Sequence, residues 1–276
     1  MNPIIRLPAE VAASVRRRWP ERGEIWTRHV VDELYEHCAR YNAQPLHVLP
    51  ARYGLVVAVD TPTGPLVMRA TTDPAGPIQA EFARAHAKLG IGPAVHEIIS
   101  TETGTWTVLD RIIPGYSLRY HKRPMTLIDH LAALFRPMID QPSPTPNAPH
   151  VADWLHRRLT GQEPDDLPPD AAPVTDHERH QALQTLDALR TDKQPGLCHG
   201  DAHPDNILIG QGDRLYFIDP RGMQGEVAYD IAVLALKAAT KLHADVRHLA
   251  TAFADKVGVD PEYAVAWVTV IHAAQV

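Results

Sequence analysis

The 276-residue chain is poor in cysteine and has no surplus of basic residues. Its two cysteines, Cys38 and Cys198, lie far apart in the sequence, so a disulfide framework is not expected and a reducing compartment fits. The formal net charge is −6, which disfavours a nucleic-acid partner, because such proteins usually carry a basic excess. The composition therefore argues against a disulfide-stapled secreted scaffold and against a nucleic-acid-binding protein.

Long apolar segments are also missing. The longest apolar runs, such as Ile231 to Leu236, fall far short of a membrane span. Residues 1–19 contain three consecutive arginines and lack the apolar stretch and cleavage site of a signal peptide. With 45% hydrophobic and 22% charged residues, the composition is that of an ordinary globular protein. We therefore expect a soluble cytoplasmic protein without a membrane partner.

Several familiar ligand-binding motifs are absent. There is no G-x-x-x-x-G-K-[ST] P-loop, and the sequence Gly-Ile-Gly-Pro-Ala-Val at 90–95 departs from the dinucleotide-binding fingerprint. The sequence His-Glu-Arg-His at 177–180 is one residue short of the H-E-x-x-H zinc motif. These departures exclude a P-loop enzyme and disfavour a dinucleotide-binding domain and a zinc hydrolase.

The first part of the chain predicts a small β-rich unit. Residues 9–19 and 26–42 have apolar residues at helical spacing. Short segments rich in valine and leucine at 46–48, 55–60 and 65–70 are separated by turn residues and predict an antiparallel meander. A helix is predicted over 77–89, with proline in its first turn, and two further strands over 97–100 and 106–111.

The second part of the chain predicts a larger, mostly helical unit. It follows the breaker Pro114-Gly115, which places the expected boundary between domains 1–113 and 114–276. Two proline-rich segments, 141–149 and 164–173, are expected to be exposed loops, and 196–219 a strand-loop-strand insertion. Helices are predicted over about 126–137, 150–160, 176–191, 227–241, 244–256 and 260–274. A ligand cleft is expected between the two lobes.

The strand-loop-strand insertion carries the residues of chemical interest. Asp201 and Asn206 lie in its polar loop, and Asp219 ends the returning strand, so that a hairpin would bring Asn206 and Asp219 together. Phosphoryl transfer needs a carboxylate that accepts or orients the proton of the attacking hydroxyl. It also needs hard oxygen ligands for Mg²⁺ that leave room for water and phosphate oxygens. We therefore predict Asp201 as the catalytic base and Asn206 and Asp219 as Mg²⁺ ligands.

The same segment resembles a known loop. The sequence His199-Gly200-Asp201, with Asn206 five positions later, resembles the HGD-x-x-x-x-N loop of aminoglycoside phosphotransferases and is similar to the HRD loop of protein kinases. The sequence Asp-Pro-Arg-Gly at 219–222 stands where protein kinases carry DFG. Together with 226–232 it is most similar to the streptomycin 6-kinase and hydroxyurea-kinase branch. The resemblance covers about 46–241 and implies an α+β, protein-kinase-like fold with a small antiparallel-sheet N-lobe and a larger, mostly helical C-lobe.

The resemblance also implies a nucleotide site that uses Mg²⁺ with ATP or GTP. In kinases a cation on the third strand holds the phosphates and pairs with a glutamate on the next helix. The residues at these positions are Arg69, where lysine is usual, and Glu81. A hinge is implied whose backbone would bind the purine edge, at Leu109, Asp110, Arg111 and Ile112.

The activity implied by the resemblance is transfer of the γ-phosphoryl group of ATP or GTP to a hydroxyl of an aminoglycoside-like antibiotic, streptomycin above all, and hence antibiotic resistance. The acidic balance suits a cationic acceptor. The alternatives are a kinase of another small alcohol, a sugar or a peptide antibiotic, and a nucleotide-binding pseudokinase that lost turnover through the change at Arg69. A protein kinase is disfavoured, because the stretch from Asp219 to Glu226 is too short for an activation loop.

The remaining polar residues of the segment have mainly structural interpretations. His199 is expected to brace the catalytic loop, as in the kinases it resembles. Tyr229 and Asp230 are expected to anchor the following helix under that loop. His203 and Asp205 are either loop residues or groups near the phosphate or metal, and the sequence leaves both possibilities open.

Overall fold

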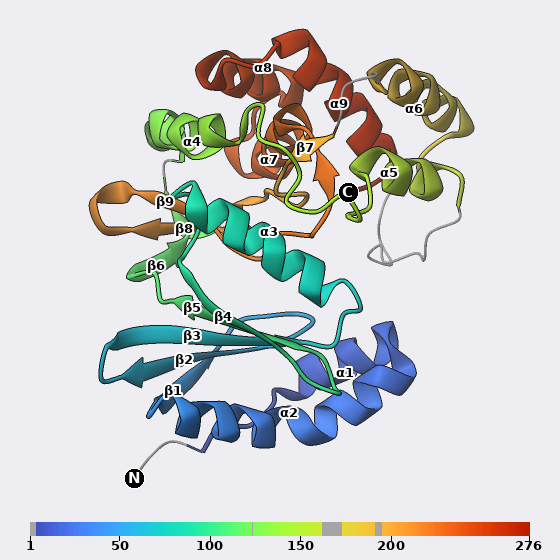
Figure 1. Cartoon of the computed structure of the whole chain (residues 1–276). Helices are drawn as coiled ribbons and strands as arrows, with labels where there is room; N and C mark the ends of the chain where they lie inside the picture. The colour runs from blue at the N-terminus through green and yellow to red at the C-terminus, as the bar shows by residue number, and fades with distance from the viewer. Residues whose placement is uncertain (1–3, 123, 162–172, 191–194) are drawn as a thin grey trace. The chain divides into compact units, whose positions relative to one another are not determined.

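The computed structural model describes residues 4–122, 124–161, 173–190 and 195–276 (Figure 1). The chain divides into two compact units, Met1–Ile113 and Pro114–Val276. Among the described residues, no helix combines the length and the hydrophobicity that crossing a bilayer requires.

The first unit is built on a five-stranded antiparallel sheet with strand order β1-β2-β3-β5-β4. The first three strands form the predicted meander: β1 (Gln44–Leu49), β2 (Leu55–Thr61) and β3 (Gly64–Thr71). Helix α3 (Gly76–Lys88) then leads to the opposite edge strand β4 (Val95–Ser100), and β5 (Thr105–Asp110) returns between β4 and β3.

Helices α1 (Ala9–Arg18) and α2 (Pro20–Arg40) cover one face of this sheet, and α3 lies on the other face (Figure 1). Helix α2 begins six residues before the predicted position. Pro20 is favourable in the first turn of a helix, so the second helix begins directly after α1. Gly23 allows the two helices to approach, since a Cβ there would lie 2.8 Å from the carbonyl oxygen of Val15. The shared core contains Val15, Trp26, Val57 and Trp106.

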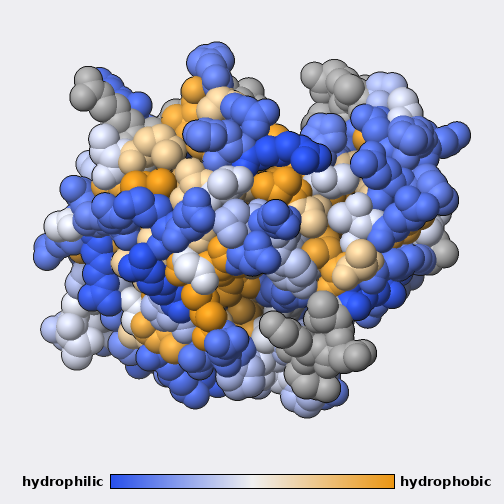
Figure 2. All heavy atoms as spheres, turned by 90° about the horizontal axis from the view of Figure 1, so that it is seen from above, coloured by the Kyte–Doolittle hydropathy of each residue, from blue (hydrophilic) through white to orange (hydrophobic). Residues whose placement is uncertain are grey.

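The second unit is mainly helical and contains two small sheets. Helix α7 (Val227–Leu242) lies at its centre and packs against α8 (Val246–Val257) and α9 (Pro261–Ala273). The helices that complete the described part are α4 (Ile128–Phe135), α5 (Val151–Leu159) and α6 (Asp176–Leu189). Viewed from the α8 side, the surface is mostly hydrophilic, with hydrophobic side chains visible in separate patches (Figure 2).

The two small sheets carry the loops of interest. Strands β6 (Pro114–Ser117), β8 (Ile207–Gly210) and β9 (Leu215–Phe217) form one sheet in the order β6-β8-β9. Strands β7 (Gly196–Leu197) and β10 (Gln224–Gly225) form the other. Strand β6 was not predicted, because its proline and glycine indicate a break; an edge position, however, tolerates a proline that cannot donate a hydrogen bond.

Two predictions for this unit need correction or lie outside the described residues. The helix predicted over 126–137 is shorter, since 3₁₀ turns at Pro124–Leu127 and Arg136–Met138 flank α4. Pro137 explains the second turn, because proline cannot continue the α-helical hydrogen-bond pattern. The proline-rich segment predicted at 164–173 lies outside the described residues except for Pro173.

Candidate active site

The loop that holds Asp201 is anchored to the first turn of α7. Asp230 is fully buried, and its carboxylate accepts hydrogen bonds from the backbone N–H groups of His199 (2.6 Å) and Gly200 (2.9 Å). The Tyr229 hydroxyl donates to the carbonyl oxygen of Gly200 (3.3 Å). The anchoring role predicted for Tyr229 and Asp230 is confirmed, and it connects helix α7 to the residues directly before Asp201.

Gly200 is required by the shape of this loop. Its φ is +81°, a left-handed value that a residue with a side chain adopts only with strain. A Cβ at this position would also lie 3.0 Å from the Cβ of Arg221. The glycine between His199 and Asp201 therefore allows the loop to pass close to the segment that follows Asp219.

His199 braces the loop from within, as predicted. Its ring is fully buried, and burial holds its pKa below the ordinary value. Nδ1 accepts a hydrogen bond from the backbone N–H of Asp201 (3.3 Å), so the proton of the neutral ring lies on Nε2, which donates to the carbonyl oxygen of Ile218 (2.8 Å). The imidazole of His199 thus connects Asp201, the proposed base, to Ile218, which directly precedes Asp219.

The hairpin β8–β9 brings the two proposed metal ligands to neighbouring positions. Ile207 pairs with Phe217, and the backbone N–H of Ile218 donates to the carbonyl oxygen of Asn206 (2.9 Å). Asp219 follows directly, with φ of +56°. The side-chain amide nitrogen of Asn206 donates to the carbonyl oxygen of Asp201 (2.9 Å), which leaves the amide oxygen as the atom suited to a cation.

The donor set of this hairpin fits Mg²⁺. One amide oxygen and one carboxylate are the few hard ligands with which proteins hold Mg²⁺ while water and phosphate oxygens complete its coordination. No cluster of three or more His, Cys, Asp or Glu side chains able to hold a metal occurs among the residues the structure describes. Two oxygen ligands fit a cation whose coordination water and phosphate oxygens complete.

A chain of polar side chains continues from Asp201 to a residue that the sequence analysis missed. His203 lies between two carboxylates, with Nε2 3.7 Å from Asp201 Oδ2 and Nδ1 3.6 Å from Asp205 Oδ2. Arg119 then pairs with Asp205 at 2.7 Å. In the sequence, Arg119 was marked only by its place two residues after Ser117. In the structure, the Ser117 hydroxyl donates to the carbonyl oxygen of Pro204 (3.0 Å) and so connects the segment of Arg119 to the loop of Asp205.

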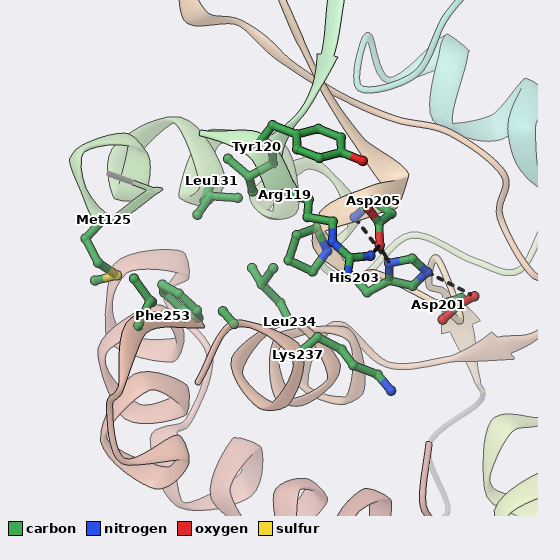
Figure 3. A pocket seen from close by; sticks show the side chains of 14 residues that line it. Arg119, Tyr120, Met125, Leu131, Asp201, His203, Asp205, Leu234, Lys237 and Phe253 are labelled. Carbon is green, nitrogen blue, oxygen red and sulfur yellow. Dashed lines mark hydrogen bonds and ion pairs between the residues drawn. The ribbon is translucent and has the colours of Figure 1, made fainter. Parts of the chain in front are cut away.

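A cavity of about 680 Å³ opens beside this loop within the second unit (Figure 3). Asp201 and His203 line one part of it, and Arg119, Asp205 and Lys237 supply the other charged groups. A molecule bound in this cavity would place its polar atoms next to Asp201, the proposed base, while it contacts residues of the second unit. The remaining lining residues are apolar, apart from the hydroxyl group of Tyr120.

In the first unit, Arg69 and Glu81 have other partners than the ones predicted. Arg69, on β3, donates to Gln79 Oε1 (3.1 Å), and Gln79 in turn donates to Asp73 Oδ2 (3.0 Å). Glu81 forms its ion pair with Arg84, one helical turn away, at 2.8 Å. The expected pairing is thus corrected, and Gln79 is a partner of Arg69 that the sequence analysis missed. Nucleotide binding by Arg69 and Glu81 stays a prediction.

The predicted hinge lies at the end of β5. Leu109 and Asp110 close the strand, and Arg111 and Ile112 follow it. The backbone N–H of Asp110 donates to Ala94 (2.9 Å), and that of Arg111 donates to Pro65 (3.2 Å). A purine edge would therefore have to use carbonyl oxygens of this segment or the N–H of Ile112, and this role stays a prediction.

Burial of Asp230 predicts a pH-dependent stability. Desolvation raises the pKa of its carboxyl from 3.8 to about 7, against the hydrogen bonds from His199 and Gly200, which lower it. Between about pH 4 and pH 7 the folded state therefore binds more protons at this residue than the unfolded state does, and its contribution to stability falls as pH rises.

We expect the free energy of unfolding of the wild type, relative to an Asp230→Asn variant, to decrease from pH 4 to pH 7 and to stay constant above. Urea unfolding of both proteins at several pH values measures this difference, in which the titrations of all other groups cancel. A carbon-13 NMR titration of the Asp230 carboxyl gives the pKa directly if the variant fails to fold. A value near that of an exposed aspartate would contradict the prediction.

Comparisons with known proteins place these features in context. The family model described as "Phosphotransferase enzyme family" matches residues 52–264. A search of curated proteins finds no match. Among solved structures, the chain is similar to an aminoglycoside-3'-phosphotransferase of type VIII, with 19% identity, a TM-score of 0.60, and coverage of 89% of this chain and 99% of that one.

Two further solved structures are similar over comparable lengths. One is a choline/ethanolamine kinase family protein from Mesorhizobium loti, with 17% identity, a TM-score of 0.62, and coverage of 87% and 79% of the two chains. The other is an aminoglycoside phosphotransferase from Streptomyces rimosus in complex with ADP and streptomycin, with 18% identity, a TM-score of 0.58, and coverage of 89% and 98%. These likenesses confirm the expected α+β, kinase-like fold.

Proposed function

Since the chain belongs to the phosphotransferase enzyme family, we propose that it is a small-molecule kinase, which transfers the γ-phosphoryl group of ATP to a hydroxyl group. The observation that carries this proposal is the bond from the Asn206 amide nitrogen to the Asp201 carbonyl oxygen, on a hairpin that continues into Asp219. It brings a candidate base and two candidate metal ligands into one loop system. Solved relatives contain ADP, which supports ATP and gives no support to GTP.

The proposed roles follow from the chemistry of each side chain. Asp201 accepts the proton of the acceptor hydroxyl, and its loop is held in place by His199 and Asp230. Asn206 and Asp219 would hold Mg²⁺, which would supply positive charge to neutralise the phosphate oxygens. Arg69, Glu81 and the hinge at 109–112 are the residues that we propose for nucleotide binding, with Arg69 held by Gln79. In this proposal residues 1–113 form the nucleotide-covering lobe and 114–276 the lobe with the catalytic loop.

Two classes of acceptor are compatible with the family. The resemblance of the Asp-Pro-Arg-Gly segment to the streptomycin 6-kinase and hydroxyurea-kinase branch favours an aminoglycoside of the streptomycin type, and hence a role in antibiotic resistance. Solved relatives are complexes with streptomycin, spectinomycin or hygromycin B. The similarity to a choline/ethanolamine kinase family protein favours another small alcohol instead. We expect the reaction to occur in the cytoplasm, where ATP is available and the buried thiols of Cys38 and Cys198 stay reduced.

A second candidate function is that of a nucleotide-binding pseudokinase. The observation that favours it is arginine at position 69, because a guanidinium fork does not reproduce the geometry of a lysine ammonium. Such a protein would bind Mg-ATP and never release a phosphorylated product. The presence of Asp201, Asn206 and Asp219 together favours the enzyme.

The proposal is tested by nucleotide binding and by transfer. At a concentration of Mg-ATP 100 times its dissociation constant, we expect stabilisation by about 2.7 kcal/mol, visible as a rise in melting temperature. With an acceptor present, mass spectrometry should show an increase of one phosphoryl group. The proposed function fails if Mg-ATP does not bind, and the pseudokinase gains if it binds but no acceptor is ever phosphorylated.

A further inference from the structure

The cavity beside Asp201 has a lining that distinguishes between the two acceptor classes. Resting on the proposed function, we propose that the acceptor is an alcohol with an apolar body and no more than one positive charge, and that it is not a polycationic aminoglycoside. The inference concerns only the described residues of the second unit, which surround the cavity on several sides.

The apolar part of the lining is extensive and comes from three helices. Leu131 of α4, Leu234 of α7 and Phe253 of α8 line the cavity, where α8 packs against both α4 and α7. Met125 and Tyr120 add apolar surface; both are exposed, Tyr120 by 77%. In the view of Figure 3, Met125, Leu131 and Phe253 lie on the side away from Asp201. An acceptor whose hydroxyl meets Asp201 would therefore place its remaining body against hydrocarbon.

The charged part of the lining does not suit a polycation. The described lining contains two carboxylates, Asp201 and Asp205, and two permanent cations, Arg119 and Lys237. Asp205 is already paired with Arg119 at 2.7 Å, and His203 lies between Asp205 and Asp201. Each desolvated ammonium of an aminoglycoside would need a carboxylate of its own, and among the described lining residues only the carboxylate of Asp201 is not already paired with an arginine.

Lys237 reinforces this electrostatic argument. It lies one helical turn after Leu234 on α7, on the same side of the helix, and its ammonium group donates to the carbonyl oxygen of Val276. Lys237 lines the cavity, and in Figure 3 its ammonium group points away from Met125, Leu131 and Phe253. A neutral acceptor meets no repulsion at this position, and a polycation does.

The proposal is tested with probes that separate apolar contact from charge. We use n-octyl β-D-glucoside, methyl β-D-glucoside, chloramphenicol, streptomycin and hygromycin B, each with Mg-ATP, and measure kcat/KM from the phosphorylated product. We expect n-octyl β-D-glucoside or chloramphenicol to be the best acceptor, by about tenfold over either aminoglycoside. We also expect the octyl glucoside to exceed the methyl glucoside by about tenfold, because only the former reaches the apolar wall.

A pair of variants tests the location of the contact. Met125→Asp places a carboxylate at the apolar side of the cavity and is expected to lower kcat/KM for the best apolar probe about tenfold, with an unchanged Kd for Mg-ATP. Ile25→Asp is the matched control, since Ile25 is an exposed apolar residue of α2 in the other unit. It should leave both quantities unchanged.

The proposal is overturned if streptomycin or hygromycin B is the best acceptor, or if the two glucosides have equal kcat/KM. Loss of Mg-ATP binding, or binding of Mg-ATP without phosphorylation of any probe, would instead reject the proposed kinase function, so the two failures are distinguishable.

Discussion

An Asp201→Asn variant is expected to lose about 10²–10⁴-fold in kcat, which corresponds to roughly 3–5 kcal/mol of barrier. Asparagine has nearly the same shape as aspartate but cannot accept the proton of the acceptor hydroxyl. The hydrogen bonds that fix this residue in the loop join its backbone N–H to His199 and its carbonyl oxygen to Asn206 and to the backbone N–H of His203, so they persist in the variant. We therefore expect the Kd for Mg-ATP and the melting temperature to change little.

The measurement is steady-state transfer to the best acceptor, combined with calorimetric titration of Mg-ATP. Asp213→Asn is the matched control, because Asp213 is an exposed aspartate in the turn between β8 and β9, and asparagine tolerates its φ of +57°. This control should retain full activity. Wild-type turnover in the Asp201→Asn variant would contradict the assignment of Asp201 as the proton acceptor.

An Asp219→Asn variant is expected to bind ATP at least about tenfold more weakly when Mg²⁺ is present and to require more Mg²⁺ for half-maximal turnover. The substitution removes the negative charge that attracts the cation. The substitution preserves the backbone conformation, because asparagine is among the residues that accept a left-handed φ such as the +56° of Asp219. Alanine would be a poorer choice, because it would add strain to the loss of charge.

Binding of ATP measured with and without a chelator separates the two effects. If Asp219 acts through the metal, wild type and variant should bind metal-free ATP equally well, and the difference should appear only when Mg²⁺ is added. An equal loss of affinity in both conditions would indicate a direct or structural role and contradict the assignment as a ligand. Asn206→Leu, which also removes an oxygen ligand, should shift the Mg²⁺ requirement in the same direction.

The order and type of most elements were accessible from the sequence, because helices and strands leave short-range periodic patterns. The meander of β1 to β3 and the helices α7 to α9 follow such patterns closely. Strand β6 did not, since its pairing with β8 depends on a segment about ninety positions later in the chain. The early start of α2 at Pro20 likewise reflects its packing against α1.

For the candidate site, the spacing of Asp201, Asn206 and Asp219 carried the hypothesis, because these residues lie in one loop and one hairpin. Only the structure provided the contacts that hold them: the buried carboxylate of Asp230 and the two-sided hydrogen bonding of His199. The contact of Arg69 with Gln79 also depended on packing, since Gln79 and Glu81 lie two positions apart on α3 and therefore point in different directions.

The sequence by itself predicted the class of chemistry, because a candidate proton acceptor and candidate oxygen ligands at fixed spacing within one loop and one hairpin are a local pattern. The character of the acceptor cavity was decided by the tertiary structure alone. Its walls come from positions 118 to 253, and whether a carboxylate is available to a cation depends on pairs such as Arg119 with Asp205, 86 positions apart. Net charge, summed over the whole chain, suggested a cationic acceptor; the charges that line the cavity favour a weakly charged one.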